Sequence, residues 1–186
     1  MQKDNKKMEI MNLFFQHPTK QWHFSEIQKI AKIADNKVSK WLKVLCNENI
    51  IKKYKPTKKM PYYISCYDKP EYQNLKRIYA LRNLHDSGLL NHLCSLKKPK
   101  AIILFGSFSR WDWHEKSDID LFFYGDDDEF EKTDYEDKLG REIQIFSCKN
   151  KHEIKKYNKD LLYSIIKGDI IKGDINFIEV NANAKA

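Results

Sequence analysis

The stretch AIILFGSFSRWDWHEKSDIDLFFY, residues 101–124, decides the fold. Its first five residues, 101–105, are all apolar, which predicts a short strand buried on both of its faces. Gly106 and Ser107 follow directly, and a glycine at the end of a strand lets backbone N–H groups approach a phosphate closely. After ten further residues come Asp118 and Asp120, and then a second apolar run.

The two aspartates lie two residues apart in a segment that is expected to be extended. Because side chains alternate along a strand, Asp118 and Asp120 should share one face while Ile119 and Leu121 point into a core. Two adjacent carboxylates repel each other unless a cation lies between them, and their oxygens suit Mg²⁺ or Mn²⁺. Together with the Gly-Ser turn they predict a site for a metal-bound nucleoside triphosphate. The alternative is a solvated face of an edge strand.

Residues 106–120 resemble the signature of the nucleotidyltransferases of the DNA polymerase β superfamily, which is Gly-Ser, ten residues, then Asp-x-Asp. The resemblance is closest to the minimal nucleotidyltransferases, whose sequences often read GSRARG and then SDIDL. The matching positions in this sequence are Gly106, Ser107, Arg110, Ser117, Asp118, Ile119, Asp120 and Leu121.

The resemblance implies a role for each matching polar residue. Asp118 and Asp120 would be catalytic and would hold Mg²⁺ (or Mn²⁺) against the triphosphate of an NTP, for which ATP is expected. Binding of the nucleotide would involve Gly106, Ser107, Arg110 and Ser117. The implied reaction is in-line attack of an acceptor on the α-phosphate, with pyrophosphate as the leaving group.

The sequence departs from this family at the third carboxylate, which relatives usually carry on a later strand. The corresponding stretch is 140–146, GREIQIF, and Gln144 stands where relatives have an aspartate. An amide cannot act as a base and is a poorer ligand for a hard cation than a carboxylate. Glu142, one pleat away (~6.5–7 Å), is the candidate substitute. Trp111 also replaces the glycine that usually follows the arginine.

The first third of the chain has a different pattern. Apolar residues recur at helical spacing over 8–17, 27–34 and 38–45, and a lysine-rich turn between two short extended segments follows at 50–64. Segment 24–64 resembles the winged helix-turn-helix regulators. The resemblance implies a helix that enters the major groove of double-stranded DNA and a wing that contacts phosphates. The DNA-binding candidates are Asn36, Lys37, Ser39, Lys40, Lys52, Lys53, Lys55, Lys58 and Lys59.

The charge distribution also separates the two parts of this chain of 186 residues, whose net charge is +8. Residues 1–66 hold 14 lysines and five acidic residues, whereas residues 67–186 hold 20 basic and 21 acidic residues. A basic excess confined to one segment favours a polyanionic partner there, with nucleic acid as the usual one. Docking of a protein remains the alternative for this segment.

The expected fold class is therefore α+β: a winged helix-turn-helix at 1–67, a helical connector at 68–97, and a small mixed-sheet, polymerase β-like nucleotidyltransferase domain at 98–186. The connector could also support a homodimer through its apolar face. The four cysteines form no CxxC pair, so we expect reduced thiols. The apolar runs are too short to span a bilayer and the N-terminus lacks a secretory signal, so we expect a cytoplasmic protein without a membrane partner.

Two functional interpretations stay open. In the first, the protein is a nucleotidyltransferase, of the adenylyltransferase type, that modifies a protein or a nucleic acid. Minimal nucleotidyltransferases of this kind are known as antitoxins that adenylylate a small helical toxin, so a toxin-like partner protein is an expectation of this interpretation. In the second, the protein is a DNA-binding transcription regulator whose transferase domain binds nucleotide without turnover or is inactive, because Gln144 replaces the third carboxylate.

Overall fold

The computed structural model describes residues 2–177 and divides into two compact units. Of the described residues, the first unit contains 2–78 together with the loop 111–116, and the second contains 79–110 and 117–177. The division falls between Ile78 and Tyr79, inside a helix, rather than on either side of a separate connector at 68–97.

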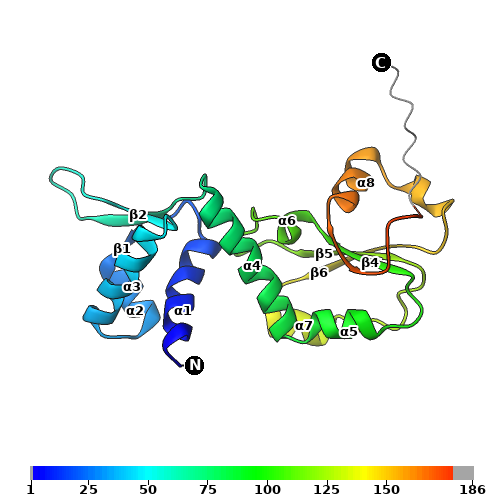
Figure 1. The fold of residues 1–186 in the computed structure, drawn as a ribbon, viewed down its shortest axis with the longest axis horizontal. Helices are drawn as coiled ribbons and strands as arrows, with labels where there is room; N and C mark the ends of the chain where they lie inside the picture. The colour runs from blue at the N-terminus through cyan, green and yellow to red at the C-terminus, as the bar shows by residue number, and fades with distance from the viewer. Residues whose placement is uncertain (1, 178–186) are drawn as a thin grey trace, which may run out of the picture. The chain divides into compact units, whose positions relative to one another are not determined.

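The first unit combines helices with a small antiparallel sheet (Figure 1). Its strands pair in the order β1-β3-β2, so that the last of the three in the sequence lies in the middle. The elements fall where the sequence pattern predicts three helices and a hairpin. The bounds are α1 Gln2–Gln16, β1 Trp22–His23, α2 Phe24–Ala31, α3 Asp35–Asn47, β2 Ile51–Tyr54 and β3 Tyr62–Ser65. The assignment of this unit to the winged helix-turn-helix group stays a proposal.

Aromatic side chains fill the core of this unit. Phe14 and Phe15 of α1 are fully buried, and the ring of Phe14 meets Trp22 edge-on at 6.3 Å. Ile27 of α2 and Leu42 of α3 are also buried, and the three helices contact one another. The helical spacing of these apolar residues explains why the three helices close around one core.

Helix α4, Pro70–Asp86, has buried residues both before and after the division at Ile78. Tyr72 donates a hydrogen bond to the carbonyl of Phe14 at 2.9 Å, and Lys76 is buried in the same unit. Further along, Ala80 and Leu84 are buried in the second unit, while Ile78 stays 61% exposed. Most of the apolar face expected for the connector is thus used within the chain, and a homodimer through it remains a prediction.

The second unit is built on a mixed four-stranded sheet in the order β6-β5-β4-β7. Strand β4 pairs antiparallel with β5 and β7, and β5 pairs parallel with β6. The α+β class with a mixed sheet is therefore as predicted. The bounds are α5 Leu89–Ser95, β4 Ala101–Phe105, α6 Gly106–Ser109, β5 Ile119–Tyr124, α7 Thr133–Leu139, β6 Ile143–Cys148, a 3-10 helix Glu153–Lys156, α8 Lys159–Ile166 and β7 Asp169–Lys172.

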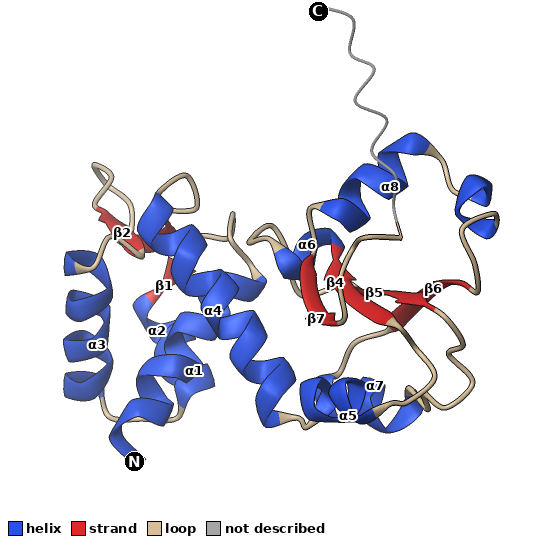
Figure 2. Ribbon diagram, turned by 45° about the vertical axis from the view of Figure 1, so that its right-hand side comes forward, coloured by secondary structure: helices blue, strands red, loops and turns tan. Residues whose placement is uncertain are grey.

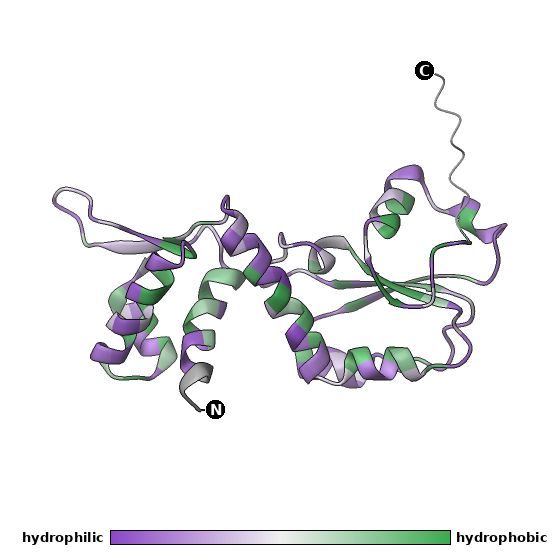
Figure 3. Ribbon diagram, viewed as in Figure 1, coloured by the Kyte–Doolittle hydropathy of each residue, from purple (hydrophilic) through white to green (hydrophobic). Residues whose placement is uncertain are grey.

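Helices cover this sheet on both faces, with α8 on one and α5 and α7 on the other (Figure 2). The α8 face holds a cluster that includes Ile103, Phe122 and Ile165, all essentially inaccessible to solvent. On the other face Phe123 stacks on Phe130 at 5.5 Å. Every residue of β4 is buried, as its unbroken apolar sequence predicts, and the central strands are the most hydrophobic part of the unit (Figure 3).

No helix in the described part of the chain combines the length and the apolar character that crossing a bilayer requires. The four cysteines carry free thiols, and burial raises the pKa of Cys148 to about 11.

Candidate active site

The turn from β4 into α6 brings Gly106 against the acidic pair. Gly106 adopts a positive φ of 71°, a backbone region that favours glycine. A Cβ atom added to Gly106 would clash with the Oδ2 atom of Asp120. Glycine is therefore required here for two reasons, and its absent side chain leaves room for a carboxylate beside the backbone of the turn.

Asp120 lies at the start of β5, between two neighbouring strands. It stands opposite Phe105 of β4 and opposite Gln144 of β6. Burial raises the pKa of the Asp120 carboxyl to about 6, and the nearby charge of Asp118 raises it as well, whereas Arg110 lowers it. Burial and the neighbouring acid both disfavour the charged form of Asp120. A cation bound here would stabilise that charged form.

Asp118 lies immediately before β5 and contacts β6 through its side chain. The Nε2 atom of Gln144 donates a hydrogen bond to Oδ2 of Asp118 at 2.6 Å. Because a carboxylate only accepts, the amide nitrogen of Gln144 must be the group that faces Asp118. The residue at the position of the third carboxylate thus contacts the acidic pair directly, and it does so as a donor.

Glu142 is placed differently. It is exposed and lies just before β6, where its carbonyl accepts a hydrogen bond from the N–H of Ile119 at 2.9 Å. It lines a shallow hollow of about 460 Å³ together with Glu136, Asp137, Gly140 and Arg141. The structure therefore brings Gln144 to Asp118 and places Glu142 at this separate hollow. The catalytic role expected for Glu142 stays a prediction.

The remaining nucleotide-binding candidates surround the turn. Ser107 is half-buried in α6, and Arg110, just after α6, is exposed and lies near enough to Asp120 to lower its pKa. Ser117 is half-buried, and its carbonyl accepts a hydrogen bond from Nη1 of Arg141 at 2.7 Å. The structure thus collects Gly106, Ser107, Arg110, Asp118 and Asp120 around the β4–α6 turn, while Ser117 contributes its carbonyl to Arg141.

Arg141 also belongs to this region, although its residue type and position did not predict this from the sequence. Besides its bond to Ser117, its guanidinium carbon lies 4.9 Å from the centre of the Phe108 ring in α6. Arg141 thereby links the segment before Asp118 to the helix after Gly106. Its only signal in the sequence is its place in GREIQIF, next to a glycine that ends α7.

The loop between the two signature motifs belongs to the first unit. Trp113 is 2% exposed, and its ring meets Phe15 edge-on at 6.1 Å. Lys76 of α4 donates a hydrogen bond to the Trp113 carbonyl at 2.5 Å, and its ammonium lies 4.5 Å from the ring centre. The N–H of Glu115 bonds to the carbonyl of Gln16 at 3.0 Å. The side chain of Trp113 and the backbone of this loop thus take part in the packing of the first unit.

The DNA-binding candidates all lie on the surface of the first unit. Those of α3 are in its first two turns, and the lysines of the hairpin lie on β2 or in the turn after it. All nine are exposed: Asn36, Lys37, Ser39, Lys40, Lys52, Lys53, Lys55, Lys58 and Lys59. They are accessible to a partner, and the identity of that partner stays a prediction.

A second acidic group lies at the opposite end of β5. Asp126, Asp127 and Asp128 come after Gly125 and can bring three carboxylate oxygens within 4.8 Å of one another. The N–H of Asp128 bonds to the Asp126 carboxylate at 3.0 Å, a local arrangement that needs no ion. A whole strand separates this group from Asp120, so it belongs to a different part of the surface.

Comparison with known families agrees with this geometry. Residues 89–176 match the family model described as polymerase beta, nucleotidyltransferase. The matched segment contains every strand of the second unit and both signature motifs. This match supports a nucleotidyltransferase domain in the chain. Comparisons with curated proteins and with solved structures found no match.

Proposed function

We propose that the protein is a nucleotidyltransferase that transfers a nucleoside monophosphate from an NTP, ATP being the expected one, to a protein or nucleic-acid acceptor. One observation supports this proposal above the others: the Asp120 carboxylate lies against the turn at Gly106. Both residues lie inside the segment that matches the nucleotidyltransferase family. A phosphate-binding turn and an acidic pair are the two parts that the reaction needs next to each other.

The residues at this turn fit a divalent cation. The pKa of Asp120 is raised to about 6 by burial and by Asp118, so the charged pair gains from a nearby positive charge. Asp118 and Asp120 would hold Mg²⁺ or Mn²⁺, which would neutralise charge on the triphosphate. Ser107 would donate to a phosphate oxygen, and Arg110, exposed at the end of α6, would pair with the same anion.

The test of the transferase is the transfer of label from a nucleotide to an acceptor. With an α-labelled NTP, Mg²⁺ or Mn²⁺ and candidate acceptors, including a small helical toxin-like protein, label should appear on the acceptor. A γ-labelled NTP should give none, since pyrophosphate leaves. The label should disappear in Asp118→Ala and Asp120→Ala. Equal labelling by these variants would contradict the proposal.

A second candidate function is favoured by the hydrogen bond from Gln144 to Asp118. In this function the second unit binds a metal-bound nucleotide and does not turn it over, and the protein acts as a DNA-binding regulator. An amide at this position offers no third carboxylate for a catalytic cation. This candidate is supported if nucleotide binds in the presence of the cation and no label is transferred to any acceptor.

Binding of double-stranded DNA by the first unit is part of both candidates. It is supported by the exposed side chains at the start of α3 and by the lysines of the hairpin. Binding should weaken steeply with salt because lysine–phosphate contacts release counterions. The double substitution of Lys58 and Lys59 by glutamine should reduce the slope of log K against log salt by about 1.8. A slope unchanged from the wild type would exclude these two lysines from phosphate contact.

A further inference from the structure

The two faces of the β1-β3-β2 sheet differ in character. On the inner face Trp22 and Tyr63 stand opposite each other and are buried. On the outer face Tyr62 of the central strand stands opposite His23 of β1 on one side and opposite Tyr54 of β2 on the other. Three rings therefore form a row across the outer face, which we call the aromatic platform (His23, Tyr54, Tyr62).

The rings of the aromatic platform are held in place before any ligand binds. Tyr54 and Tyr62 stack with their centres 5.4 Å apart and their planes 16° apart. His23 meets Tyr62 edge-on at 6.5 Å, and its Nδ1 lies 2.9 Å from the carbonyl oxygen of Pro61. Because a carbonyl only accepts, Nδ1 of His23 carries the hydrogen of this bond. Aromatic groups with fixed rotamers bind at a low cost in conformational entropy.

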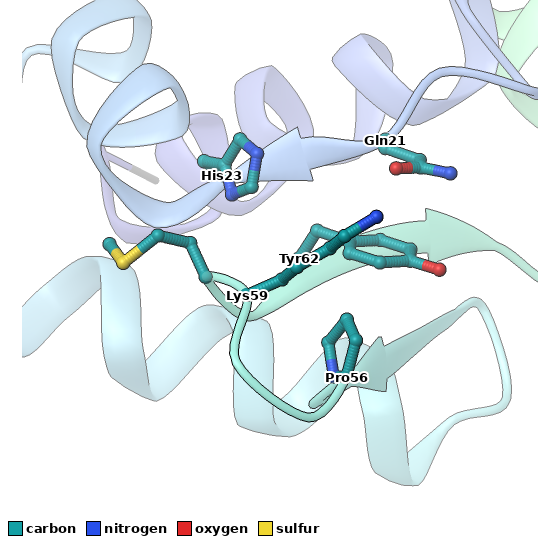
Figure 4. A pocket seen from close by; sticks show the side chains of 6 residues that line it. Gln21, His23, Pro56, Lys59 and Tyr62 are labelled. Carbon is teal, nitrogen blue, oxygen red and sulfur yellow. The ribbon is translucent and has the colours of Figure 1, made fainter.

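A hollow of about 420 Å³ lies beside the platform. Gln21 and His23 border it from the β1 side, Pro56 and Lys59 border it from the hairpin, and Tyr62 lies between them (Figure 4). Met60 also lines it. A volume of this size suits a small planar group, and the lining offers an aromatic edge, an amide and an ammonium.

The charge around the platform is positive. Lys52 places its ammonium 5.0 Å from the centre of the Tyr54 ring. Five lysines occur between residues 52 and 59, and no acidic residue occurs from 49 to 67. The nearest acid along the chain on the β1 side, Glu26, already accepts a bond from the N–H of His23 at 2.8 Å and pairs with Lys20 at 3.5 Å. The platform therefore favours a ligand that is both planar and anionic.

We propose that the aromatic platform binds an unpaired nucleobase by stacking, while the hairpin lysines hold the phosphates next to it. A base within a duplex is already stacked on its neighbours, so a flat exposed ring suits a single strand. This activity goes beyond both functions proposed above and does not depend on the transferase site. It assigns the outer sheet face to single-stranded nucleic acid, separately from the helix α3.

The test compares two single strands with the same number of phosphates, oligothymidylate and an abasic strand of equal length, by fluorescence anisotropy. EDTA is present to remove the cations that the transferase site is proposed to need. The wild type should bind the strand with bases about fivefold or more tighter, since stacking contributes roughly 1–3 kcal/mol per base. Tyr62→Leu should lose this preference, and Tyr62→Phe should keep it. Equal affinity of the wild type for both strands would overturn the proposal.

Control variants distinguish stacking on the aromatic platform from effects of charge and from loss of the fold. Tyr163→Leu removes an exposed tyrosine of α8 in the other unit and should leave the preference unchanged. Lys59→Gln should lower the affinity for both single strands by a similar factor. An RNA strand and a free mononucleotide, added as competitors, identify which source of unpaired base binds best. Retention of the preference in Tyr62→Leu, with its fold intact by circular dichroism, would also overturn the proposal.

Discussion

At the scale of single residues, Asp120 and Gln144 define the character of the candidate site. Asp120 lies against a glycine turn, beside a second acid and in a partly buried setting. Gln144 uses its amide nitrogen to satisfy one oxygen of Asp118. Without a cation, the hydrogen bond from the Gln144 amide helps to stabilise the carboxylate of Asp118. With a cation, the same side chain could offer its carbonyl oxygen only after turning its amide around.

The raised pKa of Asp120 predicts a stability effect that depends on pH. An acid whose pKa is raised from 3.8 to about 6 on folding costs stability above pH 6, and this cost vanishes as the pH falls toward 4. In EDTA at pH 7, Asp120→Asn should therefore unfold with a free energy about 1–2 kcal/mol higher than the wild type, allowing for partial exposure. The gain should shrink toward pH 4. Chemical denaturation at several pH values measures it.

Asp68→Asn is the matched control for this prediction, because Asp68 is exposed and lies in the other unit. It should change stability little at any of these pH values. An Asp120→Asn variant that is less stable than the wild type at pH 7 would show that the charged carboxylate is favoured in the folded protein.

Gln144 provides a second prediction at this scale. Gln144→Glu places a third carboxylate next to Asp118 and should lower the melting temperature in EDTA, because like charges repel. Added Mn²⁺ should then raise the melting temperature by more than it does in the wild type. Glu142→Gln is the control, since Glu142 lines a separate hollow, and it should respond to Mn²⁺ as the wild type does. A loss of the response in Glu142→Gln instead would assign the third ligand to Glu142.

At the scale of elements, the sequence predicts the two strands beside the site, but it does not predict where the loop between them packs. The apolar run 101–105 and the alternation after Asp118 predicted β4 and β5, and both strands form. The sequence identifies Trp111 in this loop only as a replacement for the glycine that usually follows the arginine in relatives. The structure places 111–116 in the first unit. Periodicity cannot reveal such packing, because the partners of Trp113 lie far away along the chain, near Phe15 and Lys76.

The position of Glu142 shows another limit of the same kind. The sequence predicts Glu142 as the substitute, one pleat from Gln144, but Glu142 lies just before β6 and lines the hollow at Gly140, whereas Gln144 contacts Asp118. The hydrogen bond from Gln144 to Asp118 depends on the parallel register of β5 and β6, which pairs Asp120 with Gln144. Strands β5 and β6 are joined by a connection that contains α7, so their register is not set by a short turn and can be obtained only from the fold.

The packing of this loop predicts that Trp113→Ala lowers the stability of the protein strongly. Replacing a buried tryptophan by alanine typically costs about 3–5 kcal/mol, so urea denaturation should detect a loss of this size. Trp111→Ala should cost less, because Trp111 is only half-buried. A loss below about 1 kcal/mol for Trp113→Ala would contradict the placement of this loop in the first unit.

At the scale of the whole molecule, the uneven charge agrees with two different surfaces. The basic excess of residues 1–66 lies on a unit whose α3 and hairpin expose lysines, whereas the acidic pair lies in a second unit of nearly balanced charge. A net charge of +8 therefore does not describe one uniform basic surface. It combines a surface suited to polyanions with an acidic pair, Asp118 and Asp120, that is proposed to bind a cation and the phosphates that it carries.

Titration calorimetry with ATP measures whether Asp118 and Asp120 form a cation-dependent site for a nucleoside triphosphate. We predict binding of ATP by the full chain in the presence of Mn²⁺, no binding in EDTA, and loss of binding in the double variant Asp118→Ala, Asp120→Ala. The variant Asp126→Ala, which alters the acidic group at the other end of β5, should bind as the wild type does. Binding that persists in the double variant, or no binding of any NTP with either cation, would show that the acidic pair is not a nucleotide site.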